Sequence, residues 1–238
     1  MSLFSILPAQ NDPLIFARKS VYEGYLTGKA IYWETGIKQM ILQVDNTPTF
    51  RTKLELAKAL YGKIGFEISR KEEEAAGKVA DQVLKLLEPM VEENDKSAEA
   101  HAILGSVYAL KIAMSPAKAL LLGPKSASHL EEAVSLNPEN PVAWCELGNM
   151  RLHAPGLFGG DVEKAIDCFS KAVRLFEKKQ EPYHWQYLHA LVWLGKAYEA
   201  KAEWGKAYEA YQYALSKEPG LRWVREELLP EARQKSGN

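Results

Sequence analysis

The sequence predicts an all-α protein, a right-handed α-solenoid of stacked helix hairpins, because one pair of short signatures recurs three times in the same order. The first signature spaces a large residue, leucine, glycine and another large residue over His101–Tyr108, Trp144–Arg151 and Leu191–Tyr198. The second signature spaces a small residue, a large apolar residue and alanine over Ser126–Ala133, Ala165–Ala172 and Ala207–Ala214. Recurrence in register over this length indicates a repeat architecture.

Each signature has the spacing of one helix face, since residues at i, i+3 and i+7 lie on the same side of a helix. A glycine inside a helix costs about 1 kcal/mol relative to alanine, so its recurrence at Gly105, Gly148 and Gly195 requires a closely packed neighbour. We expect that neighbour to be the second helix of each hairpin, with its alanines facing the glycines. Pro138 and Pro219 then end the second helices.

Together the signatures resemble the tetratricopeptide-repeat (TPR) pattern W-x2-L-G-x2-Y…A-x3-F…P, which has a period of about 34 residues. Leu188–Leu221 matches this period without gaps, and the likeness covers the chain from Ala98 to about Leu221. The resemblance implies antiparallel helix pairs. It also implies a concave face, lined by the first helices, on which the family binds peptides and other ligands.

The remaining chain has helical periodicity but departs from the consensus. Helices are expected over residues 13–26, 29–44, 52–70 and 71–93, followed after the repeats by a capping helix from Leu221 to about Arg233. The expected organisation is a possible leader remnant or flexible N-terminus at 1–12, divergent hairpins at 13–97, three TPR units at 98–221, and a cap and tail at 222–238. The apolar run Leu3–Ala9 fits either the end of a trimmed leader or a segment docked on the first helix.

Two of the repeats carry insertions at the same place, between their first and second helices. The distance from the signature glycine to the second signature is 12 residues from Gly195 to Ala207, but 17 from Gly148 to Ala165 and 21 from Gly105 to Ser126. Equivalent loops of neighbouring repeats line one edge of a solenoid, so the insertions are expected to touch. The candidate insertion-edge residues are Lys118, Lys125, Leu157 and Phe158. Either they bind a partner, or the apolar ones fold back over the helix ends.

These insertions bring a narrower resemblance. Segments around Met114-Ser115-Pro116 and Leu157-Phe158-Gly159-Gly160-Asp161 are similar to exported bacterial TPR proteins of undefined role. The second segment also looks like one in the periplasmic TPR component of TRAP-type transport systems. The resemblance implies an exported, periplasmic location, with the cytoplasm as the alternative.

The TPR register predicts a partner-binding surface on the first helices, comprising Ser106, Asn149, His153, Trp185, His189, Val192, Lys196 and Glu199. Aromatic and amide groups suit an extended peptide or a small organic ligand. The alternative is that Trp185 and nearby aromatics pack the long connection before the third repeat. The carboxylate clamp of chaperone-binding TPR domains is excluded, because the matching positions carry no lysine or arginine; these are Ala102, Ser106, Glu146, His189 and Trp193.

Composition limits the remaining function classes. Lysine plus arginine number 30 and aspartate plus glutamate 31, a balance that disfavours a dedicated nucleic-acid binder. The two cysteines, Cys145 and Cys168, lack metal-ligand spacing and are expected to pack as small apolar residues. Gly123–Ser126 is no phosphate loop, since Pro124 removes an amide that would hold phosphate. No catalytic, cofactor-binding or metal-binding set is predicted, and no segment is apolar for long enough to span a membrane.

The sequence therefore predicts a non-enzymatic scaffold or adaptor that binds a protein or peptide segment on the concave face and the insertion edge. The alternative function is a small-ligand carrier, or an accessory subunit of a transport system, with a closed pocket. The identity of the partner, the pathway and the oligomeric state stay open at this point.

Overall fold

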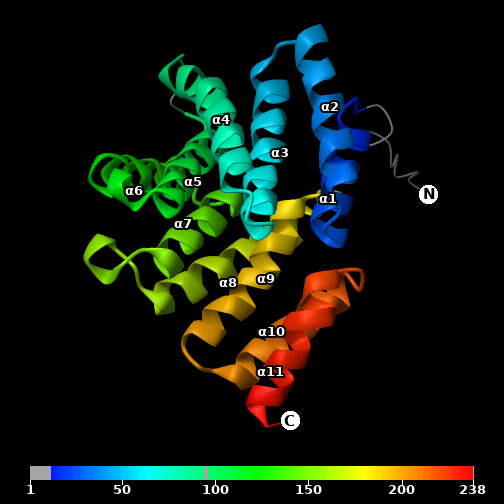
Figure 1. Ribbon diagram of the computed structural model, residues 1–238, viewed down its shortest axis with the longest axis vertical. Coiled ribbons are helices and arrows are strands. Elements are labelled where there is room, and N and C mark those ends of the chain that lie inside the picture. The colour runs from blue at the N-terminus through cyan, green and yellow to red at the C-terminus, as the bar shows by residue number, and fades with distance from the viewer. Residues whose placement is uncertain (1–11, 94–95, 238) are drawn as a thin grey trace, which may run out of the picture.

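The computed structural model describes residues 12–93 and 96–237, and within these ranges every regular element is a helix. The long helices, labelled in Figure 1, are α1 (Ile15–Thr27), α2 (Ala30–Asn46), α3 (Phe50–Ser69), α4 (Glu73–Glu93), α5 (Ala98–Met114), α6 (Ala119–Leu136), α7 (Pro141–His153), α8 (Val162–Lys179), α9 (Trp185–Ala200), α10 (Trp204–Lys217) and α11 (Leu229–Ser236). Short helical turns lie at η2 (Pro116–Lys118), η3 (Gly156–Phe158) and η4 (Val224–Leu228). The leader interpretation of residues 1–12 falls almost wholly outside the described residues.

Consecutive helices pack as hairpins, α1 with α2 through α9 with α10, and α11 packs on α10 as the cap. The predicted right-handed α-solenoid is thereby confirmed. Two divergent hairpins precede the three with recognisable signatures. The cap begins with one π-helical turn, η4, before α11.

Side-chain hydrogen bonds cap the N-termini of several of these helices. Side chains at the N-caps of α3, α5, α7 and α8 accept a hydrogen bond from a backbone N–H of the first turn; they are Thr49, Ser97, Asn140 and Asp161. Each such cap is worth about 1 kcal/mol. Pro141 follows its cap at the first helical position, where its missing N–H costs nothing.

The signature glycines do mark close approach of the second helix, as predicted, but in two hairpins the facing group is an aromatic ring and not an alanine. A Cβ at Gly195 would overlap the ring of Tyr211, and one at Gly148 would lie 3.1 Å from Phe169 Cδ1. A flat ring laid on glycine fills more volume than two small residues in contact and leaves no void.

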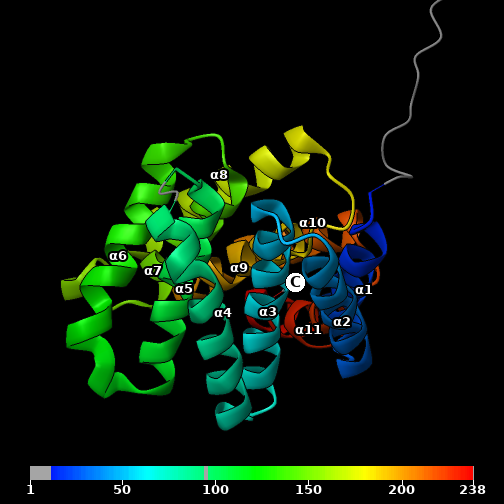
Figure 2. The same ribbon diagram turned by 90° about the horizontal axis from the view of Figure 1, so that it is seen from above.

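The first helices of the five hairpins in the described chain meet around one axis. Contacts run from α1 to α3, α5, α7 and α9 in turn, and α9 returns to contact α1. Figure 1 shows the hairpins turning in this way, and Figure 2 shows α9 passing behind the layer formed by α2, α3 and α4. The ring of first helices is therefore closed.

Aromatic side chains fill part of the axis. Trp185 is 6% exposed, and its ring centroid lies 5.6 Å from that of Tyr25, 5.9 Å from that of Tyr61 and 6.0 Å from that of Trp33. Gly62 on α3 makes room for this cluster, because a Cβ there would stand 2.5 Å from Trp33 Cη2. The first and last hairpins thus share one core.

The two insertions take different forms. The first is mostly helical, which corrects the expectation of an extra loop: α5 continues to Met114, and α6 begins at Ala119 and contains Pro124. The physical reason is the run Ala117–Leu122, whose residues favour helix strongly enough to outweigh the glycine and proline that follow. The second insertion is the short turn η3, which ends at Gly159 with a φ of 89°.

Candidate functional site

A buried carboxylate lies on the axis where three first helices meet. Glu146 on α7 is 0% exposed, and its Oε2 accepts hydrogen bonds from Tyr61 Oη at 2.5 Å, Ser106 Oγ at 2.8 Å and Asn149 Nδ2 at 2.9 Å. Burial raises the pKa of the Glu146 carboxyl, although these hydrogen bonds oppose the shift. The cluster links α3, α5 and α7 across the axis.

The polar contacts continue to the last and first hairpins through one histidine. Asn149 Nδ2 lies 3.1 Å from His189 Nε2, and Tyr25 Oη lies 3.4 Å from His189 Nδ1. Burial lowers the pKa of His189 to about 3, so its ring is neutral near pH 7. Neutral imidazole can donate at one nitrogen and accept at the other, which allows it to bridge Asn149 and Tyr25.

The predicted inner-face residues fall into two groups. Ser106, Trp185 and Val192 are buried at 4%, 6% and 1% exposure, so the folded chain gives a partner no access to them. Asn149 and His189 are partly buried in the contacts just described. These five side chains are therefore buried or partly buried in the folded chain, and their binding of a partner stays a prediction.

The other predicted residues lie at one end of the axis. His153 is exposed, and its ring centroid lies 4.8 Å from that of Trp193 on α9. One helical turn further on, Lys196 Nζ lies 2.5 Å from Glu199 Oε2, with the lysine side chain 29% exposed. We call His153, Trp193, Lys196 and Glu199, with the neighbouring turn η3, the rim.

The insertion edge contains apolar side chains that contact solvent. Leu157 and Phe158 in η3 are 91% and 55% exposed, and Leu120 and Leu121 at the start of α6 are 87% and 68% exposed. Lys118 and Lys125 are also exposed, whereas Leu122 packs against the core. The fold-back interpretation therefore holds for Leu122, whereas partner binding by the uncovered residues stays a prediction.

A pocket that the sequence did not indicate lies beneath the α8–α9 connection. Its volume is about 330 Å³, and it is lined by Phe176, Glu177, Lys179, Gln180, Glu181, His184, Tyr187 and Lys217. The backbone of the connection holds two non-glycine residues at positive φ, Gln180 at 52° and Tyr183 at 56°. Left-handed residues turn the chain sharply, which lets the connection arch over this space. We call it the connection pocket.

A smaller recess of about 30 Å³ adjoins the connection pocket, and Glu181 and His184 line both. Two buried nitrogens in the recess walls have no hydrogen-bond partner, His184 Nδ1 and Gln186 Nε2. Burial, followed by the positive charge of Lys58, lowers the pKa of His184 to about 3. A volume of this size holds about one water molecule.

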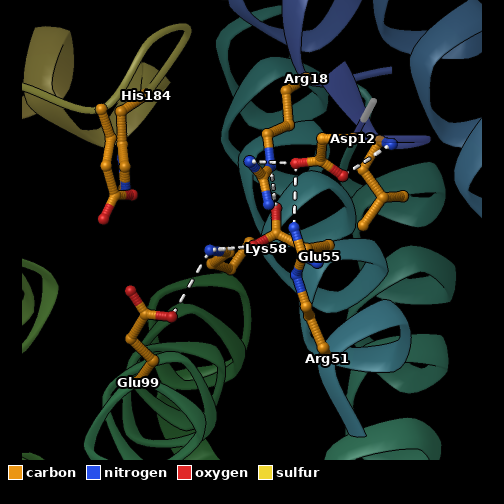
Figure 3. A network of polar contacts seen from close by, with 9 residues as sticks. Asp12, Arg18, Arg51, Glu55, Lys58, Glu99 and His184 are labelled. Carbon is orange, nitrogen blue, oxygen red and sulfur yellow. Dashed lines mark hydrogen bonds and ion pairs between the residues drawn. The ribbon is translucent and has the colours of Figure 1, made fainter. Parts of the chain in front are cut away.

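An ion-pair network that joins α1, α3 and α5 forms part of the recess wall, which Arg18, Glu55 and Lys58 line (Figure 3). It connects Asp12, Arg18, Arg51, Glu55, Lys58 and Glu99. Lys58 Nζ lies 2.6 Å from Glu55 Oε1 and 3.5 Å from Glu99 Oε2. Burial alone would raise the pKa of Glu55, but Lys58 and Arg18 outweigh it and hold the pKa at about 2. The carboxylates are therefore already paired with cations of the chain.

Metal and thiol chemistry find little support in the part of the chain described. Within residues 12–93 and 96–237, no three acidic, histidine or cysteine side chains lie where they could hold a metal ion. Cys145 and Cys168 are buried free thiols, and burial raises the pKa of both, that of Cys168 to about 11. Over the same residues, no helix has the length and apolar character to cross a bilayer.

Sequence reasoning missed Glu146, Tyr25, Lys58 and Gln186 as site residues. Lys58 and Glu55 are spaced i, i+3, which the sequence could have suggested as an exposed helix pair but not as a buried one. Glu146 stands inside a repeat signature, beside positions that pack the core. Its place within the signature is the one sequence feature that would have indicated a buried acid.

Comparison with known proteins adds information at the level of fold. No family model and no curated protein matches the sequence. Among solved structures, a thermophilic TPR protein of Thermus thermophilus is 14% identical, with a TM-score of 0.63 over 97% of this chain and 100% of that one. The fold is a TPR solenoid.

Two further structures share this fold. The HusA haemophore of Porphyromonas gingivalis is 19% identical, with a TM-score of 0.56 over 83% of this chain and 96% of that one. A chain of the APC/C hetero-tetramer Cut9–Hcn1 is 15% identical, with a TM-score of 0.53 over 94% of this chain and 40% of that one.

Proposed function

We propose that this protein is a non-enzymatic interaction module that binds a segment of a protein partner at the rim. The observation that supports this most directly is that two apolar residues, Leu157 and Phe158, are exposed in the turn η3, four and five positions after the exposed His153. Uncovered apolar side chains bordered by polar groups are typical of interaction sites. The TPR fold supports the same class of function, since Cut9 is found in a complex with Hcn1.

The chemistry of the rim defines the segment that it would hold. Leu157 and Phe158 offer apolar area for one or two hydrophobic side chains. Lys196 offers a donor for a backbone carbonyl or a carboxylate, and Glu199 already holds Lys196 in place. His153 Nδ1 donates to the Asn149 carbonyl, so the Nε2 of the neutral ring is left to accept from a backbone N–H. The partner segment is therefore expected to be short, extended and apolar at one end.

The test uses variants that change the rim without changing the core. Partners captured by the intact chain are identified, purified and titrated against the double variant Leu157→Ser/Phe158→Ser and against Lys196→Ala. We expect the double variant to weaken binding at least about tenfold, as loss of exposed anchor residues does at other interfaces. The matched control is Phe16→Ser, which removes an aromatic ring that is 72% exposed on α1.

Equal weakening by the control would mean that any exposed aromatic residue attracts the partner, and the rim assignment would be abandoned. Undiminished binding by the double variant, with an unchanged circular dichroism spectrum, would have the same consequence.

A second candidate function is a small-ligand carrier or an accessory subunit of a transport system. The connection pocket supports it, as does the fold shared with a haemophore. The local similarity to exported bacterial TPR proteins leads us to place the protein outside the cytoplasm. Fractionation of cells that express the tagged, native chain tests this location, and recovery only with cytoplasmic markers would refute it.

A further inference from the structure

The connection pocket has walls suited to a flat ring. The ring of Phe176 lies 4.8 Å from that of His184 and 5.8 Å from that of Tyr187, centroid to centroid, and all three line the pocket. Its volume of about 330 Å³ is at the lower end of the range for small-molecule sites. An aromatic compound of one or two rings therefore fits the walls in both shape and size.

Buried polar atoms lie at the inner end of this space. Gln186 is 2% exposed, and its Nε2 has no partner; the side chain of His184 is 12% exposed, and its Nδ1 has none either. A buried donor without a partner costs about 1–3 kcal/mol. An amide nitrogen can only donate, and neutral His184 can donate from Nδ1. A ligand group in the recess would therefore need to accept hydrogen bonds.

The charges around the pocket favour an anionic acceptor. Glu177 is occupied by the hydroxyls of Tyr187 and Tyr213 and by Lys217. At the mouth, Lys179 is exposed, and no hydrogen bond or ion pair joins it to another residue of the described chain. In the recess wall, Glu55 is paired with Arg18 and Lys58. The remaining acid, Glu181, opposes an anion, but its side chain is 57% exposed and solvent screens its charge.

We propose that the connection pocket binds a small aromatic carboxylate. Its ring packs against Phe176 and Tyr187, and its carboxylate accepts a hydrogen bond from His184 Nδ1–H. The single water that the recess can hold relays a second hydrogen bond from Gln186 Nε2. Lys179 balances the negative charge. The inference rests on the carrier candidate and is independent of the rim.

Titration calorimetry with indole-3-acetate and its uncharged amide, indole-3-acetamide, tests the proposal. We expect the acid to bind the full chain at least about tenfold more tightly than the amide, as loss of a charge-assisted hydrogen bond implies. Lys179→Met weakens binding of the acid several-fold and leaves the amide unaffected. Glu181→Gln strengthens binding of the acid, because the opposing charge is removed.

Lys178→Met is the matched control, since Lys178 is the preceding lysine of α8 and pairs with Glu139 away from the pocket. Equal affinity for acid and amide, no binding of either, or equal effects of Lys178→Met and Lys179→Met would each overturn the proposal. The rim variant Leu157→Ser/Phe158→Ser is titrated in parallel and should bind the acid normally. Loss of ligand binding and loss of partner binding are thereby distinguished.

Discussion

Tyr25 in the first helix and His189 in the ninth are separated by 164 positions in the chain, yet their side chains meet on the axis, with Tyr25 Oη 3.4 Å from His189 Nδ1. The same tyrosine packs on Trp185, one turn earlier in α9. This contact converts a row of hairpins into a closed ring. It also explains why the inner face, open in the expected TPR arrangement, is largely occupied by the chain itself.

Removal of the Tyr25 side chain should loosen the ring. Tyr25→Ala leaves a cavity against Trp185 and is expected to lower the free energy of unfolding by about 3 kcal/mol, the lower end of the range for a large aromatic ring, because Tyr25 is partly buried. Urea unfolding measures the loss, and hydrogen exchange should show faster opening of α1 and α9 than of α5. Tyr32→Ala on α2, where the ring is 36% exposed, is the control and should change stability little. Uniform acceleration of exchange over all helices would contradict a closure held at this point.

Two glycines of α3 should respond in opposite directions to alanine. At Gly62 a Cβ would lie 2.5 Å from Trp33 Cη2, so Gly62→Ala is expected to destabilise the fold by about 1–3 kcal/mol through overpacking. At Gly65 nothing lies within 4 Å of that position, so Gly65→Ala should stabilise by up to about 1 kcal/mol through helix propensity. Thermal unfolding of both variants checks the pair. A stabilising Gly62→Ala would mean that Trp33 is not held against α3.

The ion pairs in the recess wall should contribute more to stability than those on the surface. Lys58→Met leaves Glu55 with Arg18 alone in a buried setting, and we expect a loss of about 3 kcal/mol in the free energy of unfolding. The double variant Glu55→Gln/Lys58→Met should lose less than the sum of the two single variants, because it removes the buried carboxylate that Lys58→Met leaves short of a cation. Lys78→Met, which breaks an exposed pair with Glu74, should have no measurable effect. Strict additivity in the cycle would refute the coupling.

Stability should fall as the pH drops from about 6.5 toward 3. His184 and His189 have pKa values of about 3 in the folded chain, so only the unfolded chain takes up their protons in this window. Each contributes at most about 1.4 kcal/mol per pH unit. The raised pKa of Glu146 acts in the opposite direction, since the folded state then binds a proton first.

A variant of His189 isolates the contribution of this residue to the pH dependence of stability. His189→Gln should reduce the slope of the free energy of unfolding against pH by up to about 1.4 kcal/mol per unit between pH 6 and 4.5, above the range where most carboxylates titrate. Urea unfolding at pH 7, 6, 5 and 4.5 measures both proteins. Parallel curves for the two would show that His189 does not stay neutral in the fold.

Much of the architecture could be predicted because it depends on contacts that are near in sequence. Gly195 and Tyr211 lie 16 positions apart within one hairpin, and the signature spacing already places them on facing helix sides. The expectation of a loop in the first insertion is wrong, because the helix propensity of Ala117–Leu122 outweighs the effect of Gly123 and Pro124. Caps such as Asn140 act through the next three residues. Interactions of this range are encoded locally.

The sequence by itself thus determined the helix pairs, their right-handed stacking and the place of the insertion that contains Leu157 and Phe158. Only the tertiary structure decided whether the row of hairpins stays open. Closure depends on a small rotation at every hairpin interface, and these rotations add up over 164 residues before Tyr25 reaches His189. The burial of Trp185 and the recess, which α1, α3 and the α8–α9 connection line together, follow from that sum, and no local pattern contains it.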